Sequence, residues 1–174
     1  VVENCELTGN ADLGIHPGSG SQRPRMVNNR VSDSTYGIFF CWGVKYGLAE
    51  ANTINRCNYG VSIGHHDDEN LIINNDIVAS PINGLNFRPE RGEGFTAKGN
   101  RFENNRITDS GGDAGVAVDV LGVTANNSLI RNTIKETRGP ARRIGIQFSA
   151  ESGPMELVEN VIEGFATPVN DLRK

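Results

Sequence analysis

The chain has little of what usually marks a protein class. Aromatic residues make up 6% of its 174 residues, and apolar residues occur singly or in pairs rather than in helical blocks. The longest run without charge or strong polarity, residues 36–44, is far shorter than the ~20 residues that span a bilayer, so no membrane span is expected. The 17 basic residues are balanced by 21 acidic ones. Because nucleic-acid binding usually needs a clustered basic surface, we expect no nucleic-acid partner.

Cysteine is also scarce. The three cysteines, Cys5, Cys41 and Cys57, are odd in number and include no CxxC pair. This number and spacing of cysteines indicate neither a full disulfide framework nor a zinc site, and we predict three free thiols.

The abundant features are glycine, with 21 residues, and a repeated Asn-x-aliphatic motif. The motif occurs seven times, 23 to 30 residues apart from the second copy onward, and Cys5 replaces Asn in the first copy. The other six copies begin at Asn29, Asn52, Asn75, Asn105, Asn132 and Asn160. An apolar residue precedes each copy by three positions: Val2, Met26, Ala49, Ile72, Phe102, Leu129 and Leu157. A second motif, Gly-aliphatic-x-apolar, follows in six copies and begins at Gly14, Gly37, Gly60, Gly84, Gly115 and Gly145.

This pattern predicts a solenoid. Short alternation of apolar and polar residues is typical of a strand with one buried face, and a single coil cannot bury that face alone. Stacked coils place equivalent positions ~4.8 Å apart, so inward Asn side chains can form a hydrogen-bonded ladder. We predict an all-β, right-handed parallel β-helix of about seven coils, forming a single domain over residues 1–174, either complete or part of a longer protein. Helical repeats are excluded because no segment has a useful 3.6-residue apolar period.

The Asn-x-Ile and Gly-Ile-x-Phe motifs resemble the repeats of the pectin lyase-like superfamily over essentially the whole chain. The resemblance implies a polysaccharide or oligosaccharide partner and a secreted, periplasmic or cell-surface location. Residues 88–91, Arg-Pro-Glu-Arg, are similar to the Arg/Pro-rich motif of pectate lyases, but the spacing differs. The Asp-bearing motifs of polygalacturonate hydrolases and the Asp-Pro-His-Glu motif of alginate epimerases are missing. The resemblance therefore predicts a fold but not one reaction.

Register predicts one outward-facing strip. The second and fourth residues after each motif glycine should point to solvent. This places Ala117 in the same outward column as Asn86, and Arg88 and Asp119 at equivalent positions on adjacent coils. Candidate substrate-binding residues on or beside the strip are His16, Phe39, Trp42, Asn86, Glu90, Arg91 and Gln147.

Residues 64–69, Gly-His-His-Asp-Asp-Glu, hold the densest chemistry beside this strip. His65 or His66 is a candidate base, Arg88 a candidate for neutralising a substrate carboxylate, and Asp119 the fourth candidate catalytic residue. Asp67 and Asp68 are candidate Ca²⁺ ligands, since hard cations take oxygen ligands. The alternatives are a hydrated polar turn and a weak surface ion pair between Arg88 and Asp119.

Three functions follow from these features. The first is a carbohydrate-active protein that binds, and either cleaves or epimerises, a uronate-containing polysaccharide along the strip. Insertions at residues 88–99 and 149–153 would wall the groove. The second is a non-catalytic structural or adhesive module of a larger surface, phage or envelope protein. The third is a periplasmic metal-handling β-helix, suggested by the adjacent histidines and Cys41. Because the first coil lacks a polar cap, we also expect end-to-end or side-by-side self-association.

Overall fold

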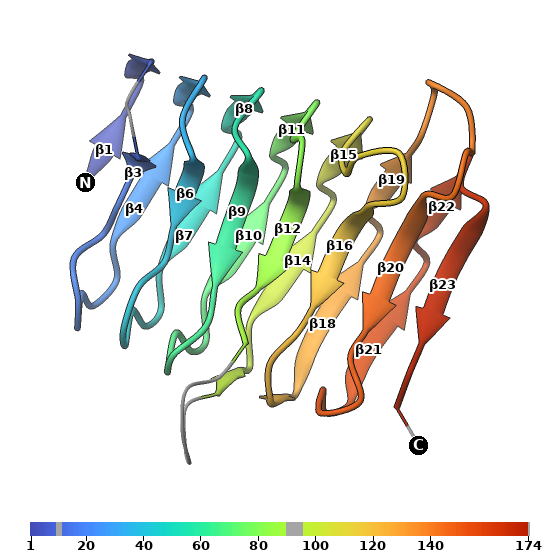
Figure 1. Cartoon of the computed structure of the whole chain (residues 1–174). Coiled ribbons are helices and arrows are strands. Elements are labelled where there is room, and N and C mark those ends of the chain that lie inside the picture. The colour runs from blue at the N-terminus through green and yellow to red at the C-terminus, as the bar shows by residue number, and fades with distance from the viewer. Residues whose placement is uncertain (10–11, 90–95, 174) are drawn as a thin grey trace.

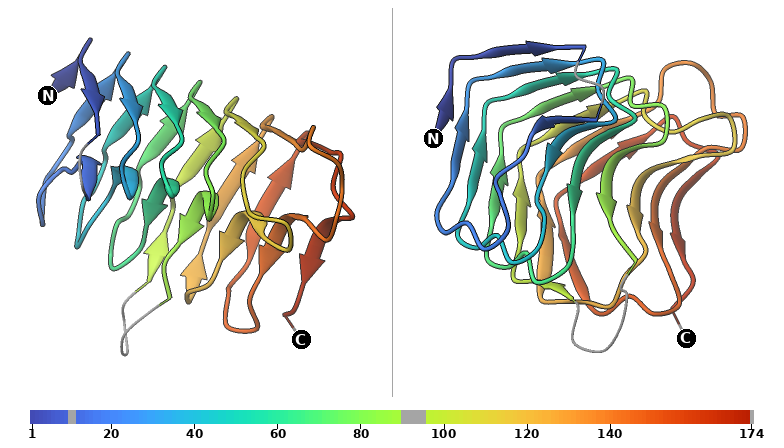
Figure 2. Two further views of the ribbon diagram at one scale, coloured as in Figure 1. Left: turned by 45° about the horizontal axis from the view of Figure 1, so that its top comes forward. Right: turned by 60° about the vertical axis from the view of Figure 1, so that its left-hand side comes forward.

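A computed structural model describes residues 1–9, 12–89 and 96–173. Its strands wind in successive coils around one axis, and equivalent strands of neighbouring coils lie side by side (Figure 1). Each coil contributes one strand to each of three parallel seven-stranded sheets. Figure 2 shows the stacked coils from two further directions. The described residues contain no α-helix. The prediction of a right-handed parallel β-helix of about seven coils is confirmed.

The sheets are named here in the order in which the chain visits them. The first sheet contains β1 (Val2–Glu3), β4 (Arg25–Val27), β7 (Leu48–Glu50), β10 (Leu71–Ile73), β14 (Arg101–Glu103), β18 (Asn127–Ile130) and β21 (Met155–Val158). The second contains β2 (Glu6–Thr8), β5 (Arg30–Ser32), β8 (Thr53–Asn55), β11 (Asp76–Val78), β15 (Arg106–Thr108), β19 (Thr133–Lys135) and β22 (Val161–Glu163). The third contains β3 (Leu13–Ile15), β6 (Tyr36–Phe39), β9 (Tyr59–Ile63), β12 (Asn83–Phe87), β16 (Val116–Val120), β20 (Ile144–Phe148) and β23 (Thr167–Asp171). A short additional pair joins β13 (Ala97–Lys98) to β17 (Thr124–Ala125).

One continuous apolar core fills the interior of the solenoid. The middle residue of each three-residue strand points inward, so Ala49, Ile72 and Phe102 align in register along the first sheet. Ile54, Ile77 and their equivalents form the corresponding row of the second sheet. Burial of these aligned rows is what a single coil cannot achieve, and it accounts for the stack.

The predicted asparagine ladder is present at the corner between the first and second sheets. The side-chain amide of Asn52 donates to Oδ1 of Asn75 at 2.9 Å, and Asn75 donates in turn to Asn105 at 2.9 Å. The same arrangement continues from Asn29 to Asn160, and five of the six residues are buried, whereas Asn160 is half-buried. The residue before each ladder position has a positive φ, 53° at Ala51 and 57° at Asn74, which turns the chain through the corner.

A second ladder, which the sequence reasoning missed, stands at the corner that precedes the first sheet. Asn70 donates to Asn100 at 3.0 Å, and Asn100 donates to Asn127 at 3.1 Å. All three residues are buried. The available signal was an Asn at or just before the first strand of three successive coils.

The predicted register of the fifth coil is wrong by two residues. Asn86 pairs with Asp119, and Leu85 with Val118, so Ala117 rather than Gly115 corresponds to Gly84. Gly115 instead closes a tight loop, in which its backbone N–H donates to Gly112 at 3.0 Å. Because Asp119 is level with Asn86, it is not equivalent to Arg88, and the expected Arg88–Asp119 pair does not form.

The three cysteines are free, which confirms the prediction that they form no mutual disulfide. Cys5 is exposed, Cys41 is partly exposed and Cys57 is buried, and burial raises the pKa of the Cys41 and Cys57 thiols. Thiolate is the reactive form. A disulfide-exchange reagent should therefore modify Cys5 first and Cys57 last in the native protein, and three thiols should react after denaturation. Peptide mass spectrometry can measure the rate of modification at each cysteine. Equal rates at Cys5 and Cys57 in the native protein would contradict the burial of Cys57.

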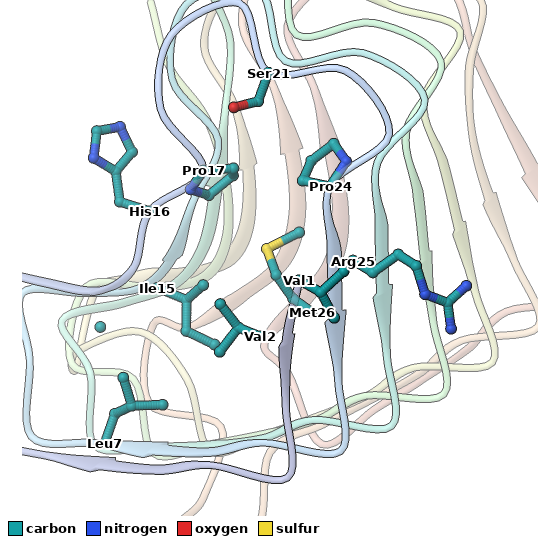
Figure 3. Close-up of a pocket in the computed structure, with 11 residues that line it drawn as sticks. Val1, Val2, Leu7, Ile15, His16, Pro17, Ser21, Pro24, Arg25 and Met26 are labelled. Atoms are coloured by element: carbon teal, nitrogen blue, oxygen red, sulfur yellow. The ribbon is translucent and has the colours of Figure 1, made fainter.

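A hollow lies at the first coil, where Figure 3 shows the inner side chains Val2, Leu7, Ile15 and Met26 around it. Its volume is about 340 Å³. Strands β1, β2 and β3 pair on one side only, so no other strand among the described residues covers these core residues. The hollow is thus the uncovered side of the first described coil rather than a pocket built from polar groups, and self-association through it stays a prediction.

Candidate functional site

Six side chains occupy equivalent positions on the outer face of the third sheet. They belong to successive strands from β6 to β23, at rungs ~4.8 Å apart. We call this row the outer column, and its members are Phe39, Ser62, Asn86, Asp119, Gln147 and Asn170.

The polar members of the outer column are linked by hydrogen bonds. Ser62 Oγ donates to Asn86 Oδ1 at 3.3 Å, and both residues are buried. Gln147 Nε2 donates to Asp119 Oδ1 at 3.4 Å, and Asn170 Nδ2 donates to Gln147 Oε1 at 2.9 Å. Asp119, Gln147 and Asn170 are partly exposed. The accessible end of the column is therefore one acid flanked by amides.

Asp119 is the one ionisable member of the outer column. Partial burial raises the pKa of its carboxyl group, and the hydrogen bond from Gln147 opposes that rise. Its second carboxylate oxygen accepts no hydrogen bond from the residues that the structure describes. Asp119 can therefore accept hydrogen bonds from a ligand on the outer face.

Aromatic rings gather at the opposite, N-terminal end of the column. Tyr36 stacks on Tyr59 with ring centroids 4.9 Å apart, and the Phe39 ring lies 4.6 Å from Tyr36. The exposed His16 ring lies 5.5 Å from Phe39. His16 and Phe39 thus share one surface, far along the stack from Asp119.

Arg88 turns from β12 toward the preceding coils. Its Nη2 lies 3.1 Å from Asp67 Oδ2, its Nη1 donates to Ser62 Oγ at 3.1 Å, and its guanidinium lies 4.5 Å from the centre of the Phe39 ring. Gly64 leaves space for this path, since a Cβ there would lie 3.2 Å from Arg88 Cβ. The Arg88 side chain is only 11% exposed. Its charge is already paired, so the structure does not support its predicted role in gripping a substrate carboxylate.

Asp67 is the buried partner in this cluster. Oδ1 accepts a hydrogen bond from the Val44 backbone N–H at 3.0 Å, and Oδ2 accepts one from Gly64 N–H at 3.0 Å. Burial is the largest cause that raises the pKa of Asp67 to about 6, and the two amides and Arg88 oppose it. Asp67 therefore anchors Arg88 and the turn after β9 at once.

Asp68 points to other partners. Lys45 Nζ lies 3.0 Å from its Oδ2, and Lys98 N–H donates to its Oδ1 at 3.2 Å. The carboxylates of Asp67 and Asp68 do not converge, and no group of three or more His, Cys, Asp or Glu in the described ranges is arranged to hold a metal ion. The geometry gives no support to the expected Ca²⁺ site.

The side chains of the two adjacent histidines lie in different environments. His65 is buried, with Nδ1 3.5 Å from Arg88 Nη2, and its ring lies 5.3 Å from the ring of Trp42. Trp42 is 53% exposed and His66 is exposed. The fold thus brings Phe39, Trp42, His65, Asp67 and Arg88 into one cluster, which we call the Arg88 cluster.

Asn86, Asp119 and Gln147 form a separate group, and Glu90 and Arg91 lie outside the described residues. Sequence reasoning left Ser62 and Asn170 out of the candidate site. Ser62 stood in the predicted outward column without an obvious chemical role. Asn170 had no signal, because its coil has Pro168-Val169 in place of the Gly-aliphatic motif.

Asp67 gives a pH-dependent prediction. Its pKa, about 6 in the folded protein, lies above the ordinary value of 3.8, so folding favours its protonated form. The stability that it contributes is fully present below pH 3.8 and falls as pH rises to about 6. Wild type should therefore lose stability relative to Asp67→Asn between about pH 4 and pH 6. Urea unfolding of both proteins across that range measures the difference, and parallel pH profiles would contradict it.

The fold and the outer column define the class of the protein: a parallel β-helix with a polar row along one sheet. The chain belongs to the NosD family, since the model of the family described as "Periplasmic copper-binding protein (NosD)" matches residues 1–88. No curated protein matches the sequence. In structure the chain is similar to the periplasmic alginate epimerase AlgG, T265N mutant, with a TM-score of 0.64 and 17% identity. That alignment covers 96% of this chain and 44% of AlgG, so the chain spans less than half of that protein.

The family description raises the question of copper. All three histidines and all three cysteines lie within residues 1–88, and imidazole and thiolate are good copper ligands. However, Cys57 is buried in the apolar core, and the Cys5 thiol lies at the first coil, where it donates to Glu3 O at 3.3 Å. No cluster of three metal-binding side chains exists in the part of the chain that the structure describes. These residues do not fit a copper site.

No helix in the described ranges is long and apolar enough to cross a membrane.

Proposed function

We propose that this β-helix binds an extended polysaccharide along the outer face of its third sheet. The observation that carries the proposal is the alignment of Asp119, Gln147 and Asn170, three partly exposed polar side chains on adjacent rungs. A polymer lying along the solenoid axis meets the same kind of contact at each rung. Repeated contacts of this kind suit a repeating ligand.

The side-chain chemistry of the outer column suits hydroxyl groups. A carboxylate accepts hydrogen bonds, whereas each amide both donates and accepts, so together they satisfy sugar hydroxyls in either direction. Exposed Trp42 and the His16–Phe39 surface add aromatic rings on which a sugar face can stack.

The geometry favours binding over cleavage. Most glycoside hydrolases use two carboxyl groups that flank the scissile bond, whereas the outer column carries one, Asp119. Asp67, the acid of the Arg88 cluster, has a fully buried side chain. A lyase mechanism with His65 as base also needs Arg88 to neutralise the substrate carboxylate. The Arg88 guanidinium is instead paired with Asp67. Catalysis by His65, His66, Arg88 and Asp119 is therefore not part of the proposal.

A binding panel tests the proposal. We expect at least one polysaccharide to retard the protein in affinity electrophoresis, and Gln147→Ala with Asn170→Ala to weaken that binding about tenfold, since each lost hydrogen bond costs about 0.5–1.5 kcal/mol. Thr53→Ala, on the exposed outer face of the second sheet, is the matched control and should bind as wild type does. Reducing ends and the ultraviolet absorbance of unsaturated uronates should not increase during incubation.

Two competing functions give different results. A structural module would bind no glycan in the panel. A copper-binding protein would retain one tight equivalent of Cu(I) or Cu(II) in equilibrium dialysis, and would lose it on Cys41→Ser or His65→Gln. Absence of binding to every glycan in the panel overturns the proposal, and so does glycan binding that the Gln147→Ala, Asn170→Ala protein retains unchanged.

A further inference from the structure

We infer, as a deepening of the proposed function on which it rests, that the polysaccharide is uncharged rather than a polyuronate. The inference starts from the charge of the accessible outer column, where Asp119 stands between Asn86 and Gln147. An ionised Asp119 repels a carboxylate placed on the same face, and the repulsion is strengthened where water is displaced. A hydroxyl in that position instead donates a hydrogen bond to the carboxylate.

The arginines at the ends of the third-sheet strands do not compensate for this charge. Arg88 is paired with Asp67, and Arg143, which directly precedes β20, is held by Asp113 at 2.5 Å and by Glu136 at 3.5 Å. The side chains of Arg88 and Arg143 are 11% and 8% exposed. Both guanidinium groups are already paired with carboxylates of this chain.

Arg173, at the last coil, is also paired with a carboxylate. Its guanidinium lies 4.1 Å from the centre of the Phe148 ring, and its Nη2 lies 2.5 Å from Asp171 Oδ2. Arg142 is exposed, but it precedes β20 by two residues and lies five residues from Gln147, about 16 Å along an extended chain. Among the described residues, no unpaired cation therefore stands on the outer column to meet a row of uronate carboxylates.

A less polar row runs beside the accessible end of the column. Leu121, Ser149 and Leu172 continue the ladder of the third sheet, because their backbone N–H groups donate to Phe87, Val120 and Phe148. Leu121 is partly exposed and Leu172 is 50% exposed. A neutral sugar ring can place its hydroxyls on the outer column while its C–H groups contact these leucines. A carboxylate directed at the same row would lose water without gaining a partner.

The test compares each neutral polysaccharide that binds, such as a soluble β-glucan, mannan or xylan, with its own carboxymethylated derivative, and adds alginate and polygalacturonate. At pH 7 and low salt we expect the neutral polymer to bind at least tenfold more tightly than the carboxylated one. Asp119→Asn keeps an oxygen to accept the Gln147 hydrogen bond. This variant should bind the neutral polymer a few fold more weakly and the carboxylated polymer more tightly than wild type does. The ratio of the two affinities should therefore decrease.

The outcomes separate the two claims. Tighter binding of a polyuronate that Asp119→Asn leaves unchanged or weakens would overturn the inference and leave the proposed function intact. Absence of binding to every neutral and acidic polymer would overturn the proposed function and the inference together. Circular dichroism and urea unfolding of Asp119→Asn confirm that the variant is folded.

Discussion

Asp67→Ala is expected to lower the free energy of unfolding by about 3–5 kcal/mol, the usual cost of removing one partner from a buried ion pair. The substitution leaves the Arg88 guanidinium enclosed beside Ser62 and the Phe39 ring without its counter-charge. It also removes the oxygens that accept hydrogen bonds from the backbone N–H groups of Val44 and Gly64. Equilibrium urea unfolding at pH 7 measures the loss.

Two variants isolate the cause of that loss. Asp33→Ala removes one partner of an exposed pair with Arg56, and exposed pairs contribute little, so its unfolding curve should nearly match that of wild type. Adding Arg88→Met to Asp67→Ala should restore part of the lost stability, because an apolar chain of similar length replaces the unpaired charge. A double variant no more stable than Asp67→Ala would contradict the account of the Arg88 cluster.

Asn105→Leu is expected to lower the free energy of unfolding by about 1–3 kcal/mol, because ladder neighbours remain buried after losing partners. Oδ1 of Asn105 accepts from both the backbone and the side-chain N–H of Asn75. Its amide donates to Ile72 O and to Asn132 Oδ1. Leucine fills a similar volume but replaces none of these hydrogen bonds.

The matched variant is Asn160→Leu at the end of the same ladder. Asn160 is half-buried and has one ladder neighbour, Asn132, so water can reach the groups that lose their partner. Its loss of stability should be smaller than that of Asn105→Leu. Equal losses in urea unfolding, or no loss at Asn105, would show that the buried ladder does not stabilise the stack.

The solenoid could be predicted from sequence because its strongest determinant repeats. Inward Asn and aliphatic residues must recur in every coil for neighbouring coils to share one core, so Asn52, Asn75 and Asn105 also fixed the register of the second sheet. The register of the third sheet was less secure, since loops of different length precede its strands. In the fifth coil an extra tight loop carries Gly115 and moves the strand by two residues relative to the motif.

The candidate site was predicted only in part, for a related reason. Alternation indicates which side chains leave the sheet, and it correctly put Asn86 and Gln147 on the outer face. It does not indicate where a long side chain goes next. Arg88 crosses Gly64 to reach Asp67, a contact set by the turn after β9 rather than by the repeat.

The most direct test of binding along the third sheet is a side-chain and backbone amide NMR titration with the tightest-binding neutral oligosaccharide. Saturating chemical-shift changes should cluster on the Gln147 and Asn170 side-chain amides and on the backbone of β16, β20 and β23. Amides of β11, β15 and β19 in the second sheet should stay unchanged. Changes confined to the second sheet, or spread evenly over all three sheets, would contradict the assignment of the outer column as the binding surface.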